Sequence, residues 1–509
     1  MRRGRERAAA AGAAALAGVV AYDLVQRRHA ILRNFPIIGH FRYLLEEVGP
    51  ELRQYIVTSN NEERPFSRDE RSWVYASSKQ RISTIGFGSD NEMELTSGYF
   101  IVKPAPRPWP RPVRGSPGGP PEHLIPCGKV LGAAHGRRHA FRPGSVVNIS
   151  GMSFGALSAN AVEALNRGAA GAPCLHNTGE GGLAPHHLHG ADLIFQIGTG
   201  YFGCRDRDGR FSLEQLRERI AAGPIRALEI KLSQGAKPGV GGLVPAAKMT
   251  PEIARIRGVE PGRDCLSPAT HSAFDGVEGL VEFVELLASE TGLPVGIKSA
   301  VGQQRFWDDL VRVMDATGGG PDFVTIDGGE GGTGAAPLAF ADHVSLPFKL
   351  GFSRVFATFA QAGLTEDVVF IGSAKLGLPA AALFAFGLGA DMVNVGREAL
   401  MSVGCIQSQR CHTGRCPTGV ATQNRWLVGG LDPASKSERC ATYVRALRGE
   451  LLALTSTCGV PHPTLVTPDM LELLDEGFTA TTAEERFGYF PAWRSVPDAR
   501  RAEIEGLFA

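Results

Sequence analysis

The chain has almost no net charge, and this excludes several classes of function. Its 53 lysine and arginine residues nearly cancel its 52 aspartate and glutamate residues over 509 positions. No field of one sign therefore attracts the protein to nucleic acid or to acidic substrates. The sequence also lacks an internal repeat with a period of about 20–50 residues. With 43% hydrophobic residues, it has the composition of a globular protein that can bury a large core.

Cysteine is scarce, and the nine cysteines are an odd number spread over a long chain. This fits a reducing compartment better than a disulfide framework. Cys405, Cys411 and Cys416 nevertheless lie within twelve residues, with the spacing C-x5-C-x4-C. A disulfide would leave one thiol over, and a structural zinc ion usually needs four ligands. A cluster of three irons, each bound by one thiolate, is the third alternative.

Long runs of strongly hydrophobic residues are absent as well. The stretch Ala8–Tyr22 is uncharged but rich in alanine and glycine, and arginines flank it on both sides. A helix that spans a membrane needs about 20 mostly apolar residues. For residues 1–28 a membrane anchor, a soluble alanine-rich helix and a cleaved signal peptide all stay open. The arginines on both flanks leave the orientation of an anchor undecided.

From residue 146 onward, short apolar runs alternate with helical stretches, which is typical of a parallel sheet buried on both faces. Eight such units over about 250 residues predict an α/β fold of the (β/α)8 TIM-barrel type. An open doubly wound sheet is the alternative, but the GxGxxG turn expected after its first strand is missing. The predicted strands are 146–151, 172–177, 192–198, 227–232, 293–298, 322–328, 367–372 and 391–396.

Other segments are expected to surround this barrel. Residues 29–145 are interpreted as an N-terminal layer, helical over 29–85 and extended over the proline-rich stretch 103–123. The barrel itself is assigned to residues 146–430. Residues 431–509 are expected to form a helical C-terminal tail.

Glycine-rich, polar stretches follow most of the predicted strands, at the end of a barrel where catalytic groups gather. They include "GMSFGALS", "NTGEGG", "SQGAKPGVGG" and "DGGEGGTGAAP". Glycine loops of this kind bind phosphate through backbone N–H groups, so we expect a cofactor that carries phosphate. Lys231 and Lys298 at two strand ends suit a flavin, whose reduced ring is stabilised by a nearby cation.

These motifs, together with "GCIQSQRCHTGRCPTGVATQ", resemble the FMN-binding synthase domain of the glutamate synthase family. The similarity covers roughly residues 145–425 and keeps the family's order of motifs. Residues 29–85, with "RNFPIIGHFRYLLE", resemble a shorter stand-alone branch of that family. The resemblance implies FMN and a 3Fe–4S cluster as cofactors, with the cluster bound by Cys405, Cys411 and Cys416.

The resemblance also implies roles for individual residues. Glu180, Lys237 and Arg257 would surround the 2-oxoglutarate site as catalytic residues. Residues expected to contact or cradle the FMN are Met152, Ser153, Gln196, Lys231, Lys298, Gly331, Gly332, Thr333, Gly372, Lys375 and Gly396. The remaining cysteines match no ligand pattern and are interpreted as core residues. His186, His187 and His189 are interpreted as a polar loop rather than a metal site.

The expected activity is that of a glutamate synthase-type oxidoreductase, which reductively aminates 2-oxoglutarate to L-glutamate. One departure bears on the substrate: the family's "KPGEGGQ" reads "KPGVGGL" here, with Val240 and Leu243 in place of polar residues. An N-methylglutamate synthase-type enzyme acting on another amine or oxo acid therefore stays open, as does a redox electron-transfer subunit.

The family's other parts are not recognisable in this sequence. No cysteine precedes Cys127, so the nucleophile of a glutaminase domain is missing, and no nicotinamide-binding motif is seen. Nitrogen is therefore expected to arrive as free ammonia or from a separate amidotransferase. Electrons are expected from a ferredoxin or a flavoprotein. The expected location is the cytoplasm, with one N-terminal helix as a candidate anchor.

Overall fold

The computed structural model describes residues 2–508, apart from residues 27, 82–83, 85, 90, 95, 111–123, 478 and 495. Most of the predicted proline-rich segment 103–123 thus lies outside the described residues. The chain divides into two compact units, Met1–Asp69 and Glu70–Ala509.

The N-terminal unit is helical. Its helices are α1 (Arg2–Val25), α2 (Ala30–Asn34) and α3 (Ile38–Leu52), and a π-helical turn, η1 (Arg53–Val57), continues α3. Within α1, residues Arg3–Val25 form a helix that is long and apolar enough to cross a membrane, by its length and composition. A signal sequence, or a buried helix of a soluble protein, can have the same length and composition.

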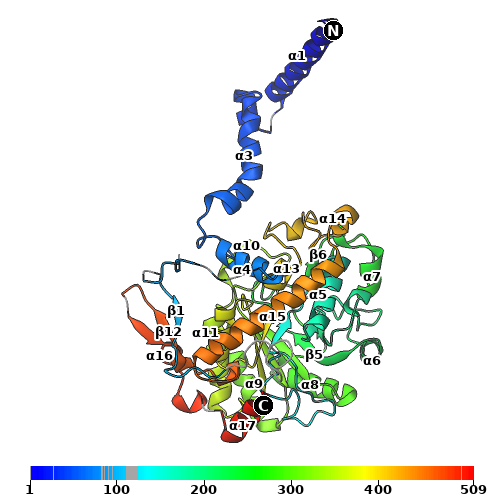
Figure 1. The fold of residues 1–509 in the computed structure, drawn as a ribbon. Helices are drawn as coiled ribbons and strands as arrows, with labels where there is room; N and C mark the ends of the chain where they lie inside the picture. Colours follow the sequence, from blue (N-terminus) through cyan, green and yellow to red (C-terminus); the bar gives the residue numbers. More distant parts are fainter. Residues whose placement is uncertain are drawn as a thin grey trace. The chain divides into compact units, whose positions relative to one another are not determined.

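The second unit contains the predicted barrel (Figure 1). In the part of the chain that the structure describes, eight parallel strands close in the order β10-β11-β2-β3-β4-β5-β8-β9. The eight predicted strands and the TIM-barrel fold are confirmed. The strands are β2 (Val147–Ile149), β3 (His176–Asn177), β4 (Leu193–Ile197), β5 (Ile225–Lys231), β8 (Val295–Ala300), β9 (Phe323–Asp327), β10 (Val369–Ser373) and β11 (Met392–Val395).

Helices cover the outside of the barrel, and local signals set their ends. The hydroxyl of Ser158 accepts a hydrogen bond from Ala161 N and thereby caps α5. Gly292, at a φ of 73°, ends α8 in the left-handed region. The surrounding helices are α5 (Ala159–Gly171), α6 (Leu213–Ala221), α7 (Pro251–Arg257), α8 (Gly276–Thr291), α9 (Arg305–Thr317), α10 (Leu338–His343), α11 (Phe348–Gln361), α12 (Pro379–Gly387), α13 (Arg397–Ser402) and α14 (Arg425–Gly429).

A hairpin-like segment closes the amino end of the barrel. Leu131 and Phe141 form an antiparallel bridge there, and Leu131 belongs to a buried cluster with Phe323 and Met392 at the starts of their strands. Each such side chain stabilises the fold by about 1.5–3 kcal/mol through burial. Because this end is plugged by apolar side chains, the polar groups of the barrel lie at its carboxyl end.

The C-terminal segment is helical only in part. Helix α15 (Pro433–Thr457) packs along α5 (Figure 1). A Cβ on Gly168 of α5 would lie 2.5 Å from the Cβ of Cys440, so the close approach of these helices requires glycine. The chain then adds strands that the sequence did not predict, β12 (Leu471–Leu474) and β13 (Ala480–Thr482), which form a sheet with β1 (Phe100–Val102). The last two α-helices are α16 (Ala483–Phe487) and α17 (Asp498–Gly506).

Candidate active site at the carboxyl end of the barrel

The loops that follow β2 and β3 lie against each other at the mouth of the barrel. Gly179, with a φ of 66°, brings the β3 loop so close that a Cβ there would lie 2.6 Å from the backbone N of Ser153. Met152 and Ser153 are therefore held beside Glu180, the next residue of the β3 loop. Only glycine combines this close contact with a left-handed backbone.

Glu180 forms the centre of a group of charges. Its Oε1 lies 3.0 Å from the Nζ of Lys231, at the end of β5. Burial alone would raise the pKa of Glu180, but the nearby cations Lys231, Lys237 and Arg257 together lower it to about 2. One carboxylate thus stands among three cations, and the mouth of the barrel carries a local positive charge suited to an anionic ligand.

Lys237 is a buried cation whose ammonium group forms no ion pair or hydrogen bond among the described residues. Burial and the charge of Lys231 lower its pKa, and Glu180 opposes this only in part. A buried ammonium group without a partner is costly. A ligand carboxylate would supply the missing partner.

Arg257, at the end of α7, donates hydrogen bonds to the loop that follows β2. Its Nη2 lies 3.4 Å from the hydroxyl of Ser153 and 3.3 Å from the carbonyl of Phe154, and its guanidinium lies over the ring of Phe202. The Nε of Arg257 is buried without a hydrogen-bond partner among the described residues. The structure thus brings Arg257 to the predicted site, where it also holds the loop.

Beneath these charges lies a buried layer of hydrogen bonds centred on Glu229 of β5. Its Oε1 accepts hydrogen bonds from the amides of Asn177 (2.8 Å) and Gln196 (2.6 Å), and its Oε2 accepts one from the hydroxyl of Thr325 (2.7 Å). This layer fixes the amide of Gln196, one of the predicted flavin contacts. Glu229 is a residue that we missed, although a carboxylate inside the apolar run "ALEIKL" is a usable signal.

Lys298 on β8 provides a second fixed cation. Its Nζ lies 3.3 Å from the Oδ2 of Asp327 at the end of β9. Burial lowers the pKa of Lys298, but the charges of Asp327 and Glu229 outweigh this, so the pKa is raised and the ammonium form persists. The same Asp327 oxygen accepts a hydrogen bond from the backbone N of Gly235 (3.2 Å), which ties the β5 loop to β9.

The glycine loop after β9 contacts its neighbours on both sides. The carbonyl of Gly332 accepts a hydrogen bond from the amide of Gln234 (2.5 Å). A Cβ on Gly332 would lie 2.5 Å from the Cδ of Arg397, the first residue of α13. Gly331 and Thr333 belong to the same loop, and Gly396 precedes Arg397. The structure thus places Gly331, Gly332, Thr333 and Gly396 on adjoining loops.

Two further residues predicted to bind the cofactor, Lys375 and Gly372, have close contacts within the protein. Lys375 forms an ion pair with Glu70 of α4 (Arg68–Ser78), at 3.2 Å. Gly372, inside β10, packs under the rings and methyl groups of Phe348 and Leu376, which a Cβ would approach to 2.9 and 2.7 Å. The pairing with Glu70 spans 305 residues, so no local pattern in the sequence could have predicted it.

The cysteine segment follows α13 at the same end of the barrel. Cys405 is held there by α4, because the hydroxyl of Tyr75 donates a hydrogen bond to its carbonyl (2.9 Å). Burial raises the pKa of the Cys405 thiol to about 12, and the charges of Cys411 and Cys416 add to this. Cys416 also raises the pKa of Cys411. The three sulfurs are thus near enough to influence one another.

Backbone N–H groups surround these sulfurs. The N of Gln407 lies 3.5 Å from the Sγ of Cys405. Burial would raise the pKa of Cys416, but the backbone N–H groups of Ala421, Thr418 and Val420 lower it. Residues 399–431 contain no aspartate or glutamate. The segment thus combines three cysteine sulfurs and N–H donors with a stretch of sequence that lacks carboxylates.

No three histidine, cysteine, aspartate or glutamate side chains among the described residues meet around one point as ligands of a single ion would. A cluster whose thiolates bind separate irons does not require such a point. His186 and His189 approach Glu252 and Glu163 respectively, while His187 is buried. The "HHLH" stretch is therefore a polar loop. The six cysteines outside the segment are all buried, as predicted.

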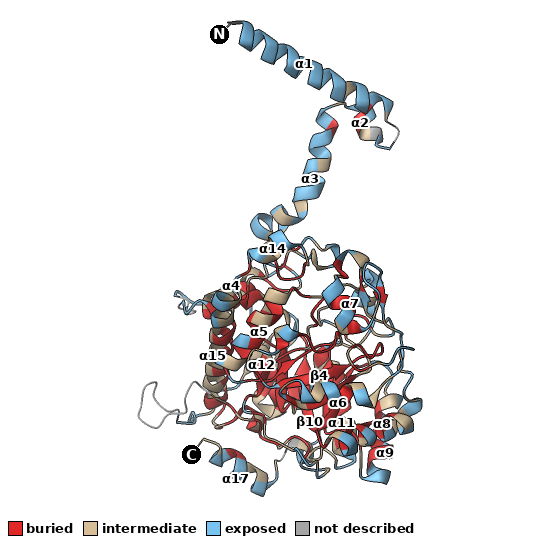
Figure 2. Ribbon diagram, turned by 90° about the vertical axis from the view of Figure 1, so that its right-hand side faces the viewer, coloured by how far each residue is buried: buried red, intermediate tan, exposed pale blue. Residues whose placement is uncertain are grey.

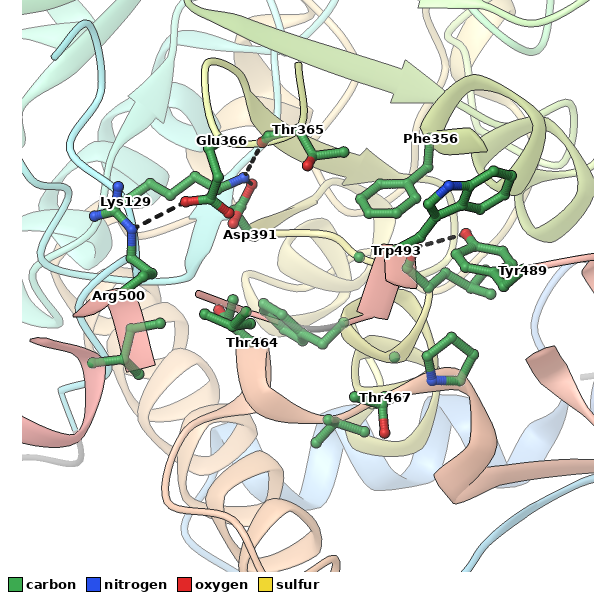
Figure 3. A pocket seen from close by; sticks show the side chains of 18 residues that line it. Lys129, Phe356, Thr365, Glu366, Asp391, Thr464, Thr467, Tyr489, Trp493 and Arg500 are labelled. Carbon is green, nitrogen blue, oxygen red and sulfur yellow. Dashed lines mark hydrogen bonds and ion pairs between the residues drawn. The ribbon is translucent and has the colours of Figure 1, made fainter. Parts of the chain in front are cut away.

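One cavity lies away from this site, at the amino end of the barrel (Figure 3). It measures about 70 Å³ and is bounded by Phe356, Tyr489 and Trp493 on one side. On the other side, Lys129 is already paired with Asp391 at 2.9 Å and Arg500 with Glu366 at 3.3 Å. Because these charges neutralise each other and no glycine loop of the carboxyl end contributes, we do not place the active site here.

His271 is a second residue that we missed. Its Nε2 donates to the carbonyl of Lys231 (3.0 Å), and its Nδ1 accepts from the hydroxyl of Tyr201 (3.1 Å). That hydroxyl in turn accepts from the backbone N of Ser272 and Ala273, which fixes the direction of every bond. Burial lowers the pKa of His271. The neutral imidazole thus fixes the backbone of Lys231 through its carbonyl. No sequence motif indicates this role of His271.

Comparison with known proteins finds relatives of this chain. A family model described as "Conserved region in glutamate synthase" matches residues 134–461. The glutamate synthase large subunit-like protein YerD of Bacillus subtilis is 39% identical over 471 residues, which cover 87% of this chain and 89% of YerD. The archaeal glutamate synthase [NADPH] of Methanocaldococcus jannaschii is 36% identical over 62% of this chain.

The match to the archaeal protein covers 59% of its length, so this chain spans about three fifths of that relative. Among solved structures, a mandelate oxidase variant with benzaldehyde matches with a TM-score of 0.44 and 14% identity, over 79% of this chain and 98% of that one. A similarity this low carries no argument about function.

Proposed function

The chain belongs to the glutamate synthase family, a family of oxidoreductases, and we propose that it reductively aminates a 2-oxo acid with FMN as its cofactor. The substrate that we propose is 2-oxoglutarate, and the product is L-glutamate. The observation that carries this proposal is the charge group at the mouth of the barrel. There, the pKa of Glu180 is lowered by three nearby cations, Lys231, Lys237 and Arg257. The buried cation Lys298 lies next to this group.

The residues present fit FMN. The amides of Asn177 and Gln196 and the ammonium group of Lys298 are fixed, buried donors and can face the polar edge of a flavin ring. The loops carrying Gly332 and Gly396 meet at the start of α13, where backbone N–H groups can bind a phosphate. When bound, FMN would supply hydride transfer.

The chain's own residues would hold and orient the substrate. Lys237, which has no partner among the described residues, and Arg257, with its unpartnered Nε, would bind the two carboxylates of the dicarboxylic acid. Glu180 would keep Lys231 in place and prevent the three cations from repelling one another. In the overall reaction, a 2-oxo acid, ammonium, a hydride and a proton yield an amino acid and water. In that reaction the oxo carbon takes the hydride, and the oxo oxygen takes up protons and leaves as water.

We further propose that Cys405, Cys411 and Cys416 bind a 3Fe–4S cluster that relays electrons to the flavin site. Their mutual influence, the N–H donors around them and the absence of carboxylates in residues 399–431 support this. Lys248 adds a cation on the barrel side, since its Nζ donates to the carbonyl of Cys411 at 2.7 Å.

The partners are part of the same proposal. The electrons would come from a ferredoxin or a flavoprotein, and the nitrogen from free ammonia or a separate amidotransferase. We place the catalytic unit in the cytoplasm, with α1 as a candidate membrane anchor.

A second candidate keeps the cofactors and changes the substrate. Val240 and Leu243 leave 38% and 42% of their surfaces exposed. A Cβ on the intervening Gly242 would lie 3.0 Å from the Oε1 of Glu180, so the segment that carries these apolar side chains passes beside the charge group. This favours an amine or oxo acid with an apolar part, as in an N-methylglutamate synthase-type reaction. A pure electron-transfer subunit is disfavoured, because electron relay does not require this charge group.

The test is reoxidation of the reduced protein. Anaerobic protein is reduced with dithionite, and its flavin absorbance is followed after 2-oxoglutarate and ammonium are added together. We expect reoxidation only when both are present, with formation of glutamate. If neither 2-oxoglutarate nor an apolar 2-oxo acid restores the oxidised spectrum, the proposed reaction is wrong.

A further inference from the structure

Exposed apolar side chains are concentrated in the N-terminal unit. More than half of the large hydrophobic side chains that are exposed among the described residues lie between Leu16 and Val57. Both α1 and α3 are almost entirely pale blue in Figure 2, in contrast to the red barrel strands. Soluble proteins rarely leave a contiguous apolar surface of this extent uncovered.

The exposed apolar residues of α3 lie on one face of the helix. Ile38, Phe41, Leu45, Val48 and Leu52 follow one another at intervals of three and four residues, and they are 76%, 61%, 45%, 37% and 40% exposed. This spacing places them along one stripe. The turn η1 extends the apolar surface, because Ile56 is 70% exposed.

The other side of α3 is charged. Arg42 and Glu46 form an ion pair at 2.9 Å on one flank of the stripe, and Glu47 is exposed on the side of the helix that faces away from the stripe. The helix therefore combines an uncovered apolar stripe with a polar side of mixed charge. This is the pattern of a helix that lies at a boundary between water and an apolar medium.

A buried carboxylate fixes α3 to the end of α1. Asp23 is fully buried and accepts a hydrogen bond from the backbone N of Ile37 (2.9 Å), directly before α3. Its Oδ1 lies 2.9 Å from the Nε2 of His40. The two helices leave this joint in different directions in both ribbon views (Figures 1 and 2). A fixed bend thus connects the candidate membrane span with the amphipathic helix.

We propose that the apolar face of α3 binds a lipid surface. With α1 inserted in the bilayer, the joint at Asp23 holds the start of α3 at the membrane boundary. The stripe from Ile38 to Leu52 then contacts the acyl chains, and the Arg42 side faces the headgroups. A lipid surface is favoured over a protein partner because the joint ties α3 to α1, the one helix of the described residues with the length and hydropathy of a membrane span.

The test uses the full-length protein reconstituted into vesicles of phosphatidylcholine and phosphatidylglycerol. A tryptophan is placed on the apolar stripe (Phe41→Trp) or, as the matched control, on the charged side of the same helix (Glu47→Trp). Both positions are exposed, and both variants share the background of the five native tryptophans. Fluorescence is then measured with lipids brominated on their acyl chains, and the quenching of the wild-type protein is subtracted.

We expect the added tryptophan of Phe41→Trp to be quenched on the order of twofold more strongly than that of Glu47→Trp. Equal quenching of the two variants would overturn the proposal. A Phe41→Trp signal that is shifted to the blue but not quenched would also overturn it, because another protein surface would then cover the stripe. The proposal would also be overturned if the protein does not bind to the vesicles, or if its intact mass shows that residues 1–25 have been removed.

Discussion

The ammonium group of Lys231 lies 3.0 Å from the Oε1 of Glu180, and this ion pair joins the loop after β3 to the end of β5. Both side chains are largely buried at the mouth of the barrel. The pair has two further cations beside it, Lys237 and Arg257. Glu180 is therefore the charge on which the arrangement of the proposed substrate site depends.

Replacement of this carboxylate should impair turnover. In Glu180→Gln, the three cations repel one another and Lys231 loses its ion pair. We therefore expect kcat to fall on the order of tenfold, which corresponds to an activation free energy that is higher by about 1.4 kcal/mol. The matched control is Glu252→Gln, which removes a surface carboxylate paired with His186. Steady-state kinetics with 2-oxoglutarate and ammonium check the prediction. Equal kcat values for the two variants would contradict it.

The apolar border of the charge group should determine substrate preference. Restoring the family's polar residue in Leu243→Gln is expected to raise kcat/KM for 2-oxoglutarate, relative to an apolar 2-oxo acid, on the order of tenfold. Leu266→Gln is the control, because Leu266 pairs with Leu243 across β6 (Leu243–Val244) and β7 (Cys265–Leu266). A preference that shifts equally in both variants would show that Leu243 has no special contact with substrate.

The hydrogen bonds beneath Lys231 give a further prediction. Tyr201→Phe removes a hydroxyl that serves His271, Ser272 and Ala273, and unpaired buried groups cost about 1–3 kcal/mol each. We expect a lower free energy of unfolding and a lower kcat, with little change in KM, because the carbonyl of Lys231 loses its fixed donor. Urea unfolding and kinetics measure both effects. Phe211→Leu, which alters a ring contact of Tyr201 without touching these bonds, should leave kcat unchanged.

Buried histidines should make the protein sensitive to mild acid. Burial lowers the pKa of His176 and of His462 to about 4. Between pH 6.5 and 4 the unfolded state binds protons that the folded state does not, so stability is complete above pH 6.5 and falls toward pH 4. A shift of this size corresponds to about 3 kcal/mol per residue.

This pH dependence is measured by urea unfolding at a series of pH values. In His462→Gln, the amide can replace the hydrogen bond to the carbonyl of Pro126, and the loss of stability toward pH 4 should be smaller than in the wild type. An identical pH profile in the variant would mean that His462 is not a source of the effect.

The barrel could be predicted because its strands are continuous apolar runs. Phe323–Asp327 is buried at every position, and such a run between helical stretches has few other solutions. The glycine loops could be placed for the same reason, since each follows a strand. The sheet of β1, β12 and β13 was missed because its strands are only three or four residues long and because β1 pairs with β12 across more than 360 residues.

The charge group was predictable only in part. Lys231 was singled out by its place at a strand end, whereas Glu180, Lys237 and Arg257 were named only through the resemblance to the family. The partners that fix them were not, because Glu229 is hidden within a strand and His271 within an irregular loop. For Lys375, the expected cofactor contact competes with the ion pair to Glu70, which depends on the packing of α4.

The central claim is that one end of the barrel carries both a flavin and a cluster bound by three cysteines. The most direct measurement is the FMN and iron content of anaerobically purified protein, in the wild type, in Cys411→Ser and in the core control Cys458→Ser. The account predicts about one FMN and about three irons per chain in the wild type and in Cys458→Ser, and FMN with little iron in Cys411→Ser. Wild-type protein without flavin, or iron that is retained in full by Cys411→Ser, would contradict it.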